Sequence, residues 1–346
     1  MARRTLYWAS LALSPVVVVL RFGFAEKGSL VFVLAAVALA PLAFLIGEAT
    51  ENVAEHTGPG IGGFLNASFG NAPELIIALF AIGDSLPNVV RGSIAGSVVS
   101  TALLVLGGAM ALAEPGEIDR RSVSLQISIV VLVVLLFLVP SIPGWHGDPD
   151  RHSLYVASLP VAAILLVVYL LVTVRNLRTH SASERAPAAV DAWPLRKAVG
   201  VLGLATLATA LVSEALVHSL DAFGEALGLS QFFVAAVIVA LVGNAAEQGG
   251  AVVIARRGNV RLGAEIAISS STQVAAFVAP VVAIASSLIG RGLPLAFRPI
   301  EIGAMAVAAT VVVLVTIDGR TRRWEGLLLL AIYALVVVAF ALSGDR

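Results

Sequence analysis

Long runs of apolar residues recur along the whole chain, separated by short segments that contain charged residues, Gly or Pro. A helix that crosses the hydrocarbon core of a bilayer needs about 20 predominantly apolar residues. Cutting the chain at its polar segments therefore predicts about eleven membrane spans. Their expected limits are 6–22, 28–55, 60–83, 88–113, 122–140, 153–175, 195–222, 229–255, 262–290, 299–317 and 324–343.

The composition indicates that much of the folded surface contacts lipid. Hydrophobic residues make up 59% of the chain and charged residues 13%, whereas soluble domains average about 45–50% and about 25%. We therefore expect an all-α integral membrane protein. The formal net charge of +0 argues against a nucleic-acid partner. The absence of cysteine excludes disulfides and thiolate metal sites.

The positions of Lys and Arg predict the orientation of the spans. Cytoplasmic loops carry an excess of these residues, and with eleven spans fifteen of the 22 fall on one side and seven on the other. The N-terminus is then expected in the cytoplasm and the C-terminus on the opposite side. The start of the chain resembles a signal peptide but lacks a clean small-residue cleavage site, so we expect a retained first helix. A short chain without long tails fits a prokaryotic inner membrane.

A five-residue motif occurs twice. GNAPE at 70–74 recurs as GNAAE at 243–247, a shift of 173 residues, and the same shift carries GSVVS at 96–100 onto SSSTQ at 269–273 without a gap. A repeat of five helices has an odd number of spans, so its second copy enters the membrane from the opposite side. Such inverted-topology repeats are typical of secondary transporters, whose sites lie near the bilayer midplane.

The repeat predicts how the chain is organised. The longest polar connection, RNLRTHSASERAPAAVDAWPLRK, is rich in Ala, Ser and Pro and separates the two copies. We therefore expect an N-terminal transmembrane helix at 1–27, a first transporter repeat at 28–176, a cytoplasmic connection at 177–194 and a second transporter repeat at 195–346.

Each copy of the motif places a glutamate in the middle of an apolar span. A carboxylate there is costly unless it is paired, protonated or facing a cavity, so Glu74 and Glu247 are functional candidates. Gly and Asn are poor helix formers and Pro73 removes a backbone donor, so we expect a helix break that frees carbonyl oxygens to face an ion. Carboxylate, carbonyl, Asn and Ser oxygens together suit a hard divalent cation such as Ca²⁺.

These residue types also have structural explanations. In membranes Gly and Ala serve close helix packing, Ser hydroxyls bond between helices, and a single buried Glu can belong to a structural pair. Two glutamates in matching motifs at symmetric positions are harder to explain in this way. The chain has no H-E-x-x-H, G-x-S-x-G or Walker A motif, so it is expected to be neither an enzyme nor an ATP-driven pump, and to need no cofactor.

Two longer segments resemble the signatures of a known family. GEATENVAEHTGPGIGGFLNASFGNAPELIIALFAI followed by GSIAGSVVSTALLVLG is similar to the first signature of the calcium/proton exchangers, within the calcium/cation antiporter superfamily. SEALVHSLDAFGEALGLSQFFVAAVIVALVGNAAEQ followed by ISSSTQVAAFVAP is similar to the second. The resemblance covers 28–113 and 195–290. It implies an antiporter that exchanges Ca²⁺ for H⁺ by alternating access in a lipid bilayer.

The resemblance also implies roles for individual residues. Glu74 and Glu247 would be shared ligands for the cation and for protons. The other implied roles are metal ligation by Asn71, Asn244 and the carbonyls of Gly70 and Gly243, access paths at Glu48 or Glu51 and at Glu214, and positions facing the site at Ser100 and Gln273.

Two features depart from the family. Its members generally have His after the second motif, and here this position, next to a proton-carrying glutamate, is Gln248. Many members also have an acidic stretch between the halves, whereas this connection is mildly basic. The alternatives are a Na⁺-coupled or Mn²⁺-selective antiporter, a passive cation channel and a non-transporting membrane scaffold. The oligomeric state stays open.

Overall fold

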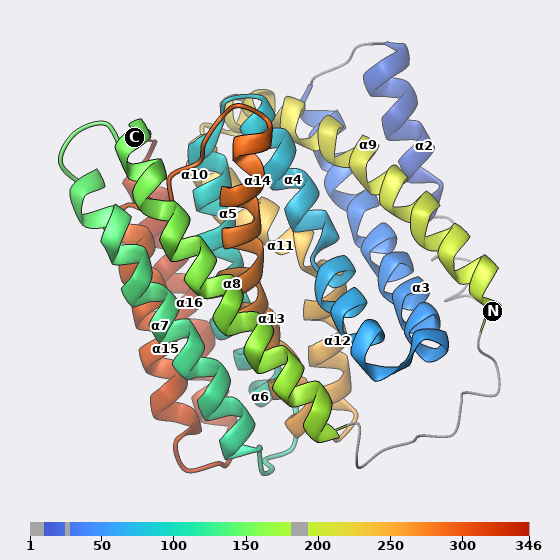
Figure 1. Cartoon of the computed structure of the whole chain (residues 1–346), viewed down its shortest axis with the longest axis vertical. Coiled ribbons are helices and arrows are strands. Elements are labelled where there is room, and N and C mark those ends of the chain that lie inside the picture. The colour runs from blue at the N-terminus through green and yellow to red at the C-terminus, as the bar shows by residue number, and fades with distance from the viewer. Residues whose placement is uncertain (1–9, 25–27, 181–192, 346) are drawn as a thin grey trace. The chain divides into compact units, whose positions relative to one another are not determined.

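A computed structural model describes residues 10–24, 28–180 and 193–345. Within these ranges every regular element is an α-helix or a π-helix, the latter written η (Figure 1). The expected all-α class is confirmed. The tip of the expected N-terminal helix and most of the expected connection at 177–194 lie outside the described residues.

The helix boundaries follow the chain in two halves. The N-terminal half contains α2 (Leu13–Val18), η1 (Val19–Gly23), α3 (Ser29–Gly70), α4 (Ala72–Gly83), α5 (Pro87–Val99), η2 (Ser100–Val105), α6 (Leu106–Leu112), α7 (Arg120–Gly144) and α8 (His152–His180). The C-terminal half contains α9 (Leu195–Leu227), α10 (Gln231–Phe233), η3 (Val234–Val239), α11 (Ala240–Gly243), α12 (Ala245–Arg256), α13 (Val260–Gln273), η4 (Val274–Val278), α14 (Ala279–Leu288), α15 (Pro299–Thr316) and α16 (Arg323–Ser343).

The apolar helices are those of a multi-pass membrane protein. Among the described residues, eight helices are long and apolar enough to span a bilayer, and a ninth span results if the bent pair Gln231–Gly243 and Ala245–Arg256 is counted as one. Leu13–Gly23 and Ala72–Gly83 are shorter apolar helices. All of these segments fall within or close to the expected spans and in their order. The exact count of eleven stays a prediction, because two of the segments are too short to count on length alone.

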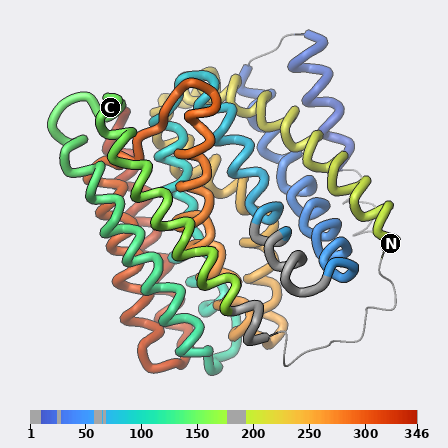
Figure 2. Tube along the Cα trace, in the orientation of Figure 1, coloured from blue at the N-terminus to red at the C-terminus, as the bar shows by residue number. Residues whose placement is uncertain are grey.

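Two compact units make up the structure, and each takes segments from both halves of the chain. The first comprises Met1–Phe80, Val167–Ala226 and Val242–Ala246, and the second comprises Ala81–Leu166, Leu227–Leu241 and Glu247–Arg346. The colours of Figure 2 show this mixing inside the second unit, where the green α7 runs beside the red α15. The compact units therefore do not coincide with the expected repeats, whose limits stay predictions.

The core of the first unit lies between α3 and α9. Ile46, Ala49 and Val53 on α3 pack against Ala198 and Leu202 on α9 in one buried cluster. Small side chains at such a contact let two helix backbones approach closely, which is the main source of packing energy where lipid is the solvent.

Close helix crossings at glycine hold the second unit together. A Cβ added to Gly96 on α5 would lie 1.8 Å from the carbonyl oxygen of Ala236 on η3. A Cβ added to Gly326 on α16 would lie 2.7 Å from the carbonyl oxygen of Gly107 on α6. Only glycine leaves room for backbones this close, as in other membrane helix pairs.

The sequence repeat reappears in the helix boundaries. A shift of 173 residues moves both ends of α4, Ala72 and Gly83, onto both ends of α12, Ala245 and Arg256. The same shift moves the start of α5 onto the start of α13 and the start of α6 onto the start of α14. The shift moves the start of the π-helix η2 to within one residue of the start of the π-helix η4. The segments 72–112 and 245–288 therefore fold into the same succession of helices.

Asp119 fixes the start of α7. Its carboxylate accepts hydrogen bonds from the backbone N–H groups of Ser122 (3.2 Å) and Arg121 (3.0 Å). The Ser122 bond is the main reason why the pKa of Asp119 lies below its ordinary value. Because this pKa is depressed, the cap stabilises the folded protein fully at pH values above the ordinary pKa of Asp. This stabilisation is lost as the pH falls through the pKa of Asp119 in the folded protein.

Candidate ion-binding site

Both copies of the motif interrupt a helix at the expected place. In the first copy α3 ends at Gly70, Asn71 has φ −98° and ψ 15°, and α4 begins at Ala72. In the second copy α11 ends at Gly243, α12 begins at Ala245, and the axis bends by 61°. The predicted breaks are confirmed. Non-helical backbone at membrane depth is tolerated where it is buried in protein or lines a cavity.

Glu74 lies in the first unit, next to residues of the second motif. Both of its carboxylate oxygens are buried. A Cβ added to Gly243 would lie 3.1 Å from Glu74 Oε1, so the backbone of the second motif approaches the carboxylate of the first. Asn71 and Asn244 are also buried, at 1% and 3% exposure. The structure thus brings Glu74 and Gly243, two of the expected ligands, together.

Glu247 lies in the second unit, against the serine-rich segments of both repeats. Its carboxylate forms a hydrogen bond with Ser270. The neighbouring Gln248 donates through Nε2 to Ser100 Oγ at 3.4 Å, a contact between the second repeat and the first. Gln273 donates through Nε2 to Ser269 Oγ at 3.3 Å. Ser100, expected to face the site, therefore lies beside the residue that follows Glu247.

Each glutamate lies in the first turn of a helix. Glu74 belongs to the first turn of α4 and Glu247 to the first turn of α12. The N-terminus of a helix carries a partial positive charge of about half an elementary charge, which stabilises a nearby carboxylate. The helix break thus offsets part of the cost of placing each carboxylate in an apolar span.

The two acidic residues expected on an access path along α3 lie on one exposed face of it. Glu48 and Glu51 are exposed, as is Glu55 one turn further on. Between them Asn52 accepts a hydrogen bond from the backbone N–H of Trp193 at 2.7 Å. This part of α3 therefore also contacts the segment that leads into α9.

Glu214 has partners that sequence reasoning missed. The guanidinium of Arg21 donates two hydrogen bonds to its carboxylate, at 2.8 and 3.1 Å, and His218 Nδ1 lies 3.3 Å from the same carboxylate. Both members of the Arg21 pair are largely buried, at 12% and 16% side-chain exposure. A single Arg at the end of an apolar helix was the available signal, because such a cation needs a counter-charge.

The acidic side chains of the described residues do not gather into a metal-binding group. In the described part of the chain, no three or more His, Asp or Glu side chains come together as a metal-binding group. Each motif instead offers one carboxylate, one buried Asn and the carbonyls of a broken helix. Such hard oxygen donors suit Ca²⁺, which accepts carboxylate, amide and backbone oxygens in flexible geometry.

Comparisons with known proteins find relatives that match along most of the chain. The family model for the sodium/calcium exchanger protein matches residues 27–178 and 197–342. The Ca(2+)/H(+) antiporter of Aphanothece halophytica is 35% identical, covering 90% of this chain and 89% of that protein. The Ca(2+)/H(+) antiporter ChaA of Bacillus subtilis is 32% identical, covering 91% and 92%.

Solved structures show the same fold. Native YfkE superposes with a TM-score of 0.82 at 29% identity, over 97% of this chain and 99% of that one. The H⁺/Ca²⁺ exchanger CAX superposes with a TM-score of 0.75 at 16% identity, which is evidence for the fold alone. The expected resemblance is confirmed, and the chain belongs to the sodium/calcium exchanger protein family, among whose members its curated relatives are named Ca²⁺/H⁺ antiporters.

Proposed function

We propose that this chain is a secondary active antiporter that exchanges Ca²⁺ for H⁺ across a membrane. The observation that carries the proposal is the pair of matched helix breaks, each with a glutamate in the first turn that follows. The family and the names of the curated relatives support Ca²⁺ and H⁺ as the transported ions.

The proposed mechanism uses Glu74 and Glu247 as ligands for both ions. A carboxylate inside an apolar span is stable when a cation binds it or a proton neutralises it. Bound Ca²⁺ therefore keeps the glutamates ionised, and its release lets them take up protons for the return step. The approach of Gly243 to Glu74 supports a role for the second motif beside the first carboxylate. Asn71, Asn244 and the carbonyl of Gly70 would supply further oxygens.

Alternating access would connect these ligands to each side of the membrane in turn. Glu48 or Glu51 and Glu214 would lie along the access paths, and Ser100 and Gln273 would face the ions. Matched breaks in two copies of one repeat support this mechanism, because inverted repeats give a transporter two related conformations.

Ca²⁺ uptake into proteoliposomes, measured with a radioactive tracer, tests the proposal. We expect uptake to require an imposed pH gradient and to be accompanied by proton counterflow. A Ca²⁺ flux that does not depend on the pH gradient would indicate a passive channel. Uptake driven by a Na⁺ gradient would favour a Na⁺-coupled antiporter. Transport of Mn²⁺ in place of Ca²⁺ would favour a Mn²⁺-selective antiporter.

The variant Gln248→His is expected to change the pH profile of exchange. An imidazole next to Glu247 adds a group that titrates near neutrality, whereas Gln is neutral and donates to Ser100. Exchange should persist in the native chain, with a pH dependence set by the two coupled glutamates. The measurement is initial Ca²⁺ flux against pH, and the profile should move more than the apparent Ca²⁺ affinity at high pH. Superimposable profiles would exclude this position from proton coupling.

The proposed orientation predicts which sites a membrane-impermeant thiol reagent reaches. Because the native chain has no cysteine, the single variants Ser183→Cys and His146→Cys can be labelled cleanly. The positive-inside rule places position 183 in the cytoplasm and position 146 on the opposite side. We expect labelling of intact cells at 146 alone, and at 183 only after permeabilisation. Labelling of both in intact cells would contradict a membrane crossing by α8 between them.

A further inference from the structure

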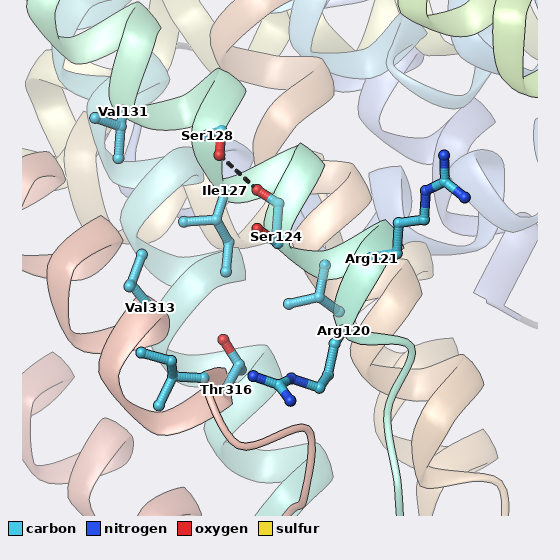
Figure 3. A pocket seen from close by; sticks show the side chains of 10 residues that line it. Arg120, Arg121, Ser124, Ile127, Ser128, Val131, Val313 and Thr316 are labelled. Atoms are coloured by element: carbon cyan, nitrogen blue, oxygen red, sulfur yellow. Dashed lines mark hydrogen bonds between the residues drawn. The ribbon is translucent and has the colours of Figure 1, made fainter.

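A pocket opens in the second unit between one end of α7 and the facing end of α15 (Figure 3). Its volume is about 640 Å³. Arg120, Ser124 and Ser128 line it from α7, and Thr316 lines it from α15. None of its lining residues belongs to the motifs that hold Glu74 and Glu247, and nothing in the proposed exchange uses it.

The pocket has one polar end and one apolar wall. Arg120 and Thr316 lie at the end at which α7 begins, whereas Ser124 and Ser128 lie about one and two turns further along α7 (Figure 3). Val131, Val313 and Ile317 form the wall, and they are 37%, 37% and 62% exposed. In a membrane protein, apolar side chains exposed on spanning helices contact acyl chains. The pocket is thus continuous with surface that faces lipid.

The Arg120 side chain is held in a defined position. Gly319, in the turn after α15, has φ +75°, and a Cβ there would lie 2.4 Å from Cγ and Cδ of Arg120. The stem of Arg120 therefore lies directly on this turn, which glycine makes possible. In Figure 3 the guanidinium of Arg120 points toward Thr316, whereas that of Arg121 points away.

The carboxylates next to this end of the pocket form ion pairs with arginines other than Arg120 and Arg121. Asp119 forms an ion pair with Arg261 at 3.0 Å, and Asp318 pairs with Arg322. Within the described residues, neither Arg120 nor Arg121 has a carboxylate within the 4.0 Å of an ion pair. The guanidinium of Arg120 is therefore available to an anion from outside the chain.

The hydroxyl groups of the pocket narrow the choice of anion. Thr316 Oγ1 donates its proton to the carbonyl of Val312 at 2.6 Å, and Ser128 Oγ donates to the carbonyl of Ser124 at 2.7 Å. Both hydroxyl oxygens then have lone pairs left to accept hydrogen bonds. A ligand that combines a phosphate for Arg120 with hydroxyl donors of its own fits this set better than a bare phosphate.

We propose that the pocket binds an anionic glycerophospholipid whose headgroup carries hydroxyl groups, of the phosphatidylglycerol type. The phosphate pairs with the planar guanidinium of Arg120, which suits bidentate phosphate binding. A headgroup hydroxyl donates to Thr316 beside Arg120, and an acyl chain runs along Val131, Val313 and Ile317. Basic pockets between membrane helices are known sites for anionic headgroups.

Native mass spectrometry of the detergent-solubilised protein tests this site. We expect phosphatidylglycerol to bind one-to-one and more tightly than phosphatidylcholine. Arg120→Gln should weaken phosphatidylglycerol binding by about fivefold, the equivalent of about 1 kcal/mol for one basic contact. The matched control is Arg257→Gln, an exposed arginine at the end of another helix, which should leave binding unchanged.

A second variant keeps the test independent of Arg120. Thr316→Val keeps the shape of the side chain, removes the accepting oxygen, and should weaken phosphatidylglycerol more than phosphatidic acid, whose headgroup has no glycerol hydroxyls. Equal binding by wild type, Arg120→Gln and Thr316→Val, with unchanged melting temperatures, would overturn the proposal. So would equal affinity for phosphatidylcholine, or displacement of the lipid by inorganic phosphate, which would indicate a site for the free ion.

Discussion

Glu74→Gln and Glu247→Gln are each expected to abolish Ca²⁺/H⁺ exchange while the protein still folds and inserts. Gln keeps the shape of the side chain and much of its hydrogen bonding, but it can neither balance a divalent cation nor carry a proton. Removing one partner of a buried charge pair costs about 3–5 kcal/mol. That is a loss of roughly two to four orders of magnitude in affinity for the ion.

The measurement is pH-driven Ca²⁺ uptake by proteoliposomes that contain equal amounts of each folded variant. Glu114→Gln is the matched control, because Glu114 is 82% exposed and pairs with Arg323 away from both motifs. Its uptake should equal that of wild type. Substantial exchange by a variant with a native melting temperature would remove that glutamate from the mechanism, while leaving the other to be judged separately.

Gly96→Ala is expected to destabilise the second unit strongly. The added methyl group would fall 1.8 Å from the carbonyl oxygen of Ala236, and a backbone atom can yield only if α5 and η3 move apart. Overpacking of a tight core costs about 1–3 kcal/mol and sometimes more. We expect about 3 kcal/mol or more here, because the obstacle is backbone rather than a flexible side chain.

Gly303→Ala isolates the clash from the general effect of replacing glycine in a helix. A Cβ at Gly303 in α15 meets nothing within 4 Å. Both substitutions gain the same helix propensity, about 1 kcal/mol in favour of Ala. Thermal unfolding in detergent should therefore show a fall in melting temperature for Gly96→Ala and none for Gly303→Ala. Equal melting temperatures would mean that α5 and η3 do not cross this closely.

The features predictable from the sequence are those that depend on neighbours along the chain. Apolar runs of spanning length give the spans, because the bilayer sets that length. The breaks at Asn71 and Asn244 follow from poor helix formers inside otherwise apolar helices. The expected span 28–55 likewise lies close to the apolar segment Ser29–Thr57 of the structure.

The features that could not be predicted depend on contacts between distant segments. Nothing near Glu214 in the sequence indicates that Arg21, 193 residues earlier, is its partner. The close crossing at Gly96 could not be predicted either. A glycine in a membrane helix indicates a close helix contact, but the sequence does not show which helix is the partner. The mixing of both halves in each compact unit also follows from three-dimensional packing rather than from order along the chain.

The π-helix η2, between α5 and α6, should make this part of the chain tolerant of single-residue deletions. A π-turn accommodates one residue more than an α-turn. Deleting one residue within Ser100–Val105 can therefore close the wide turn to an α-turn and leave Gly107 facing α16. The same deletion within α5 would rotate everything beyond it by about 100°, since an α-helix has 3.6 residues per turn. Single-residue deletions should accordingly be accepted in η2 and rejected a turn earlier.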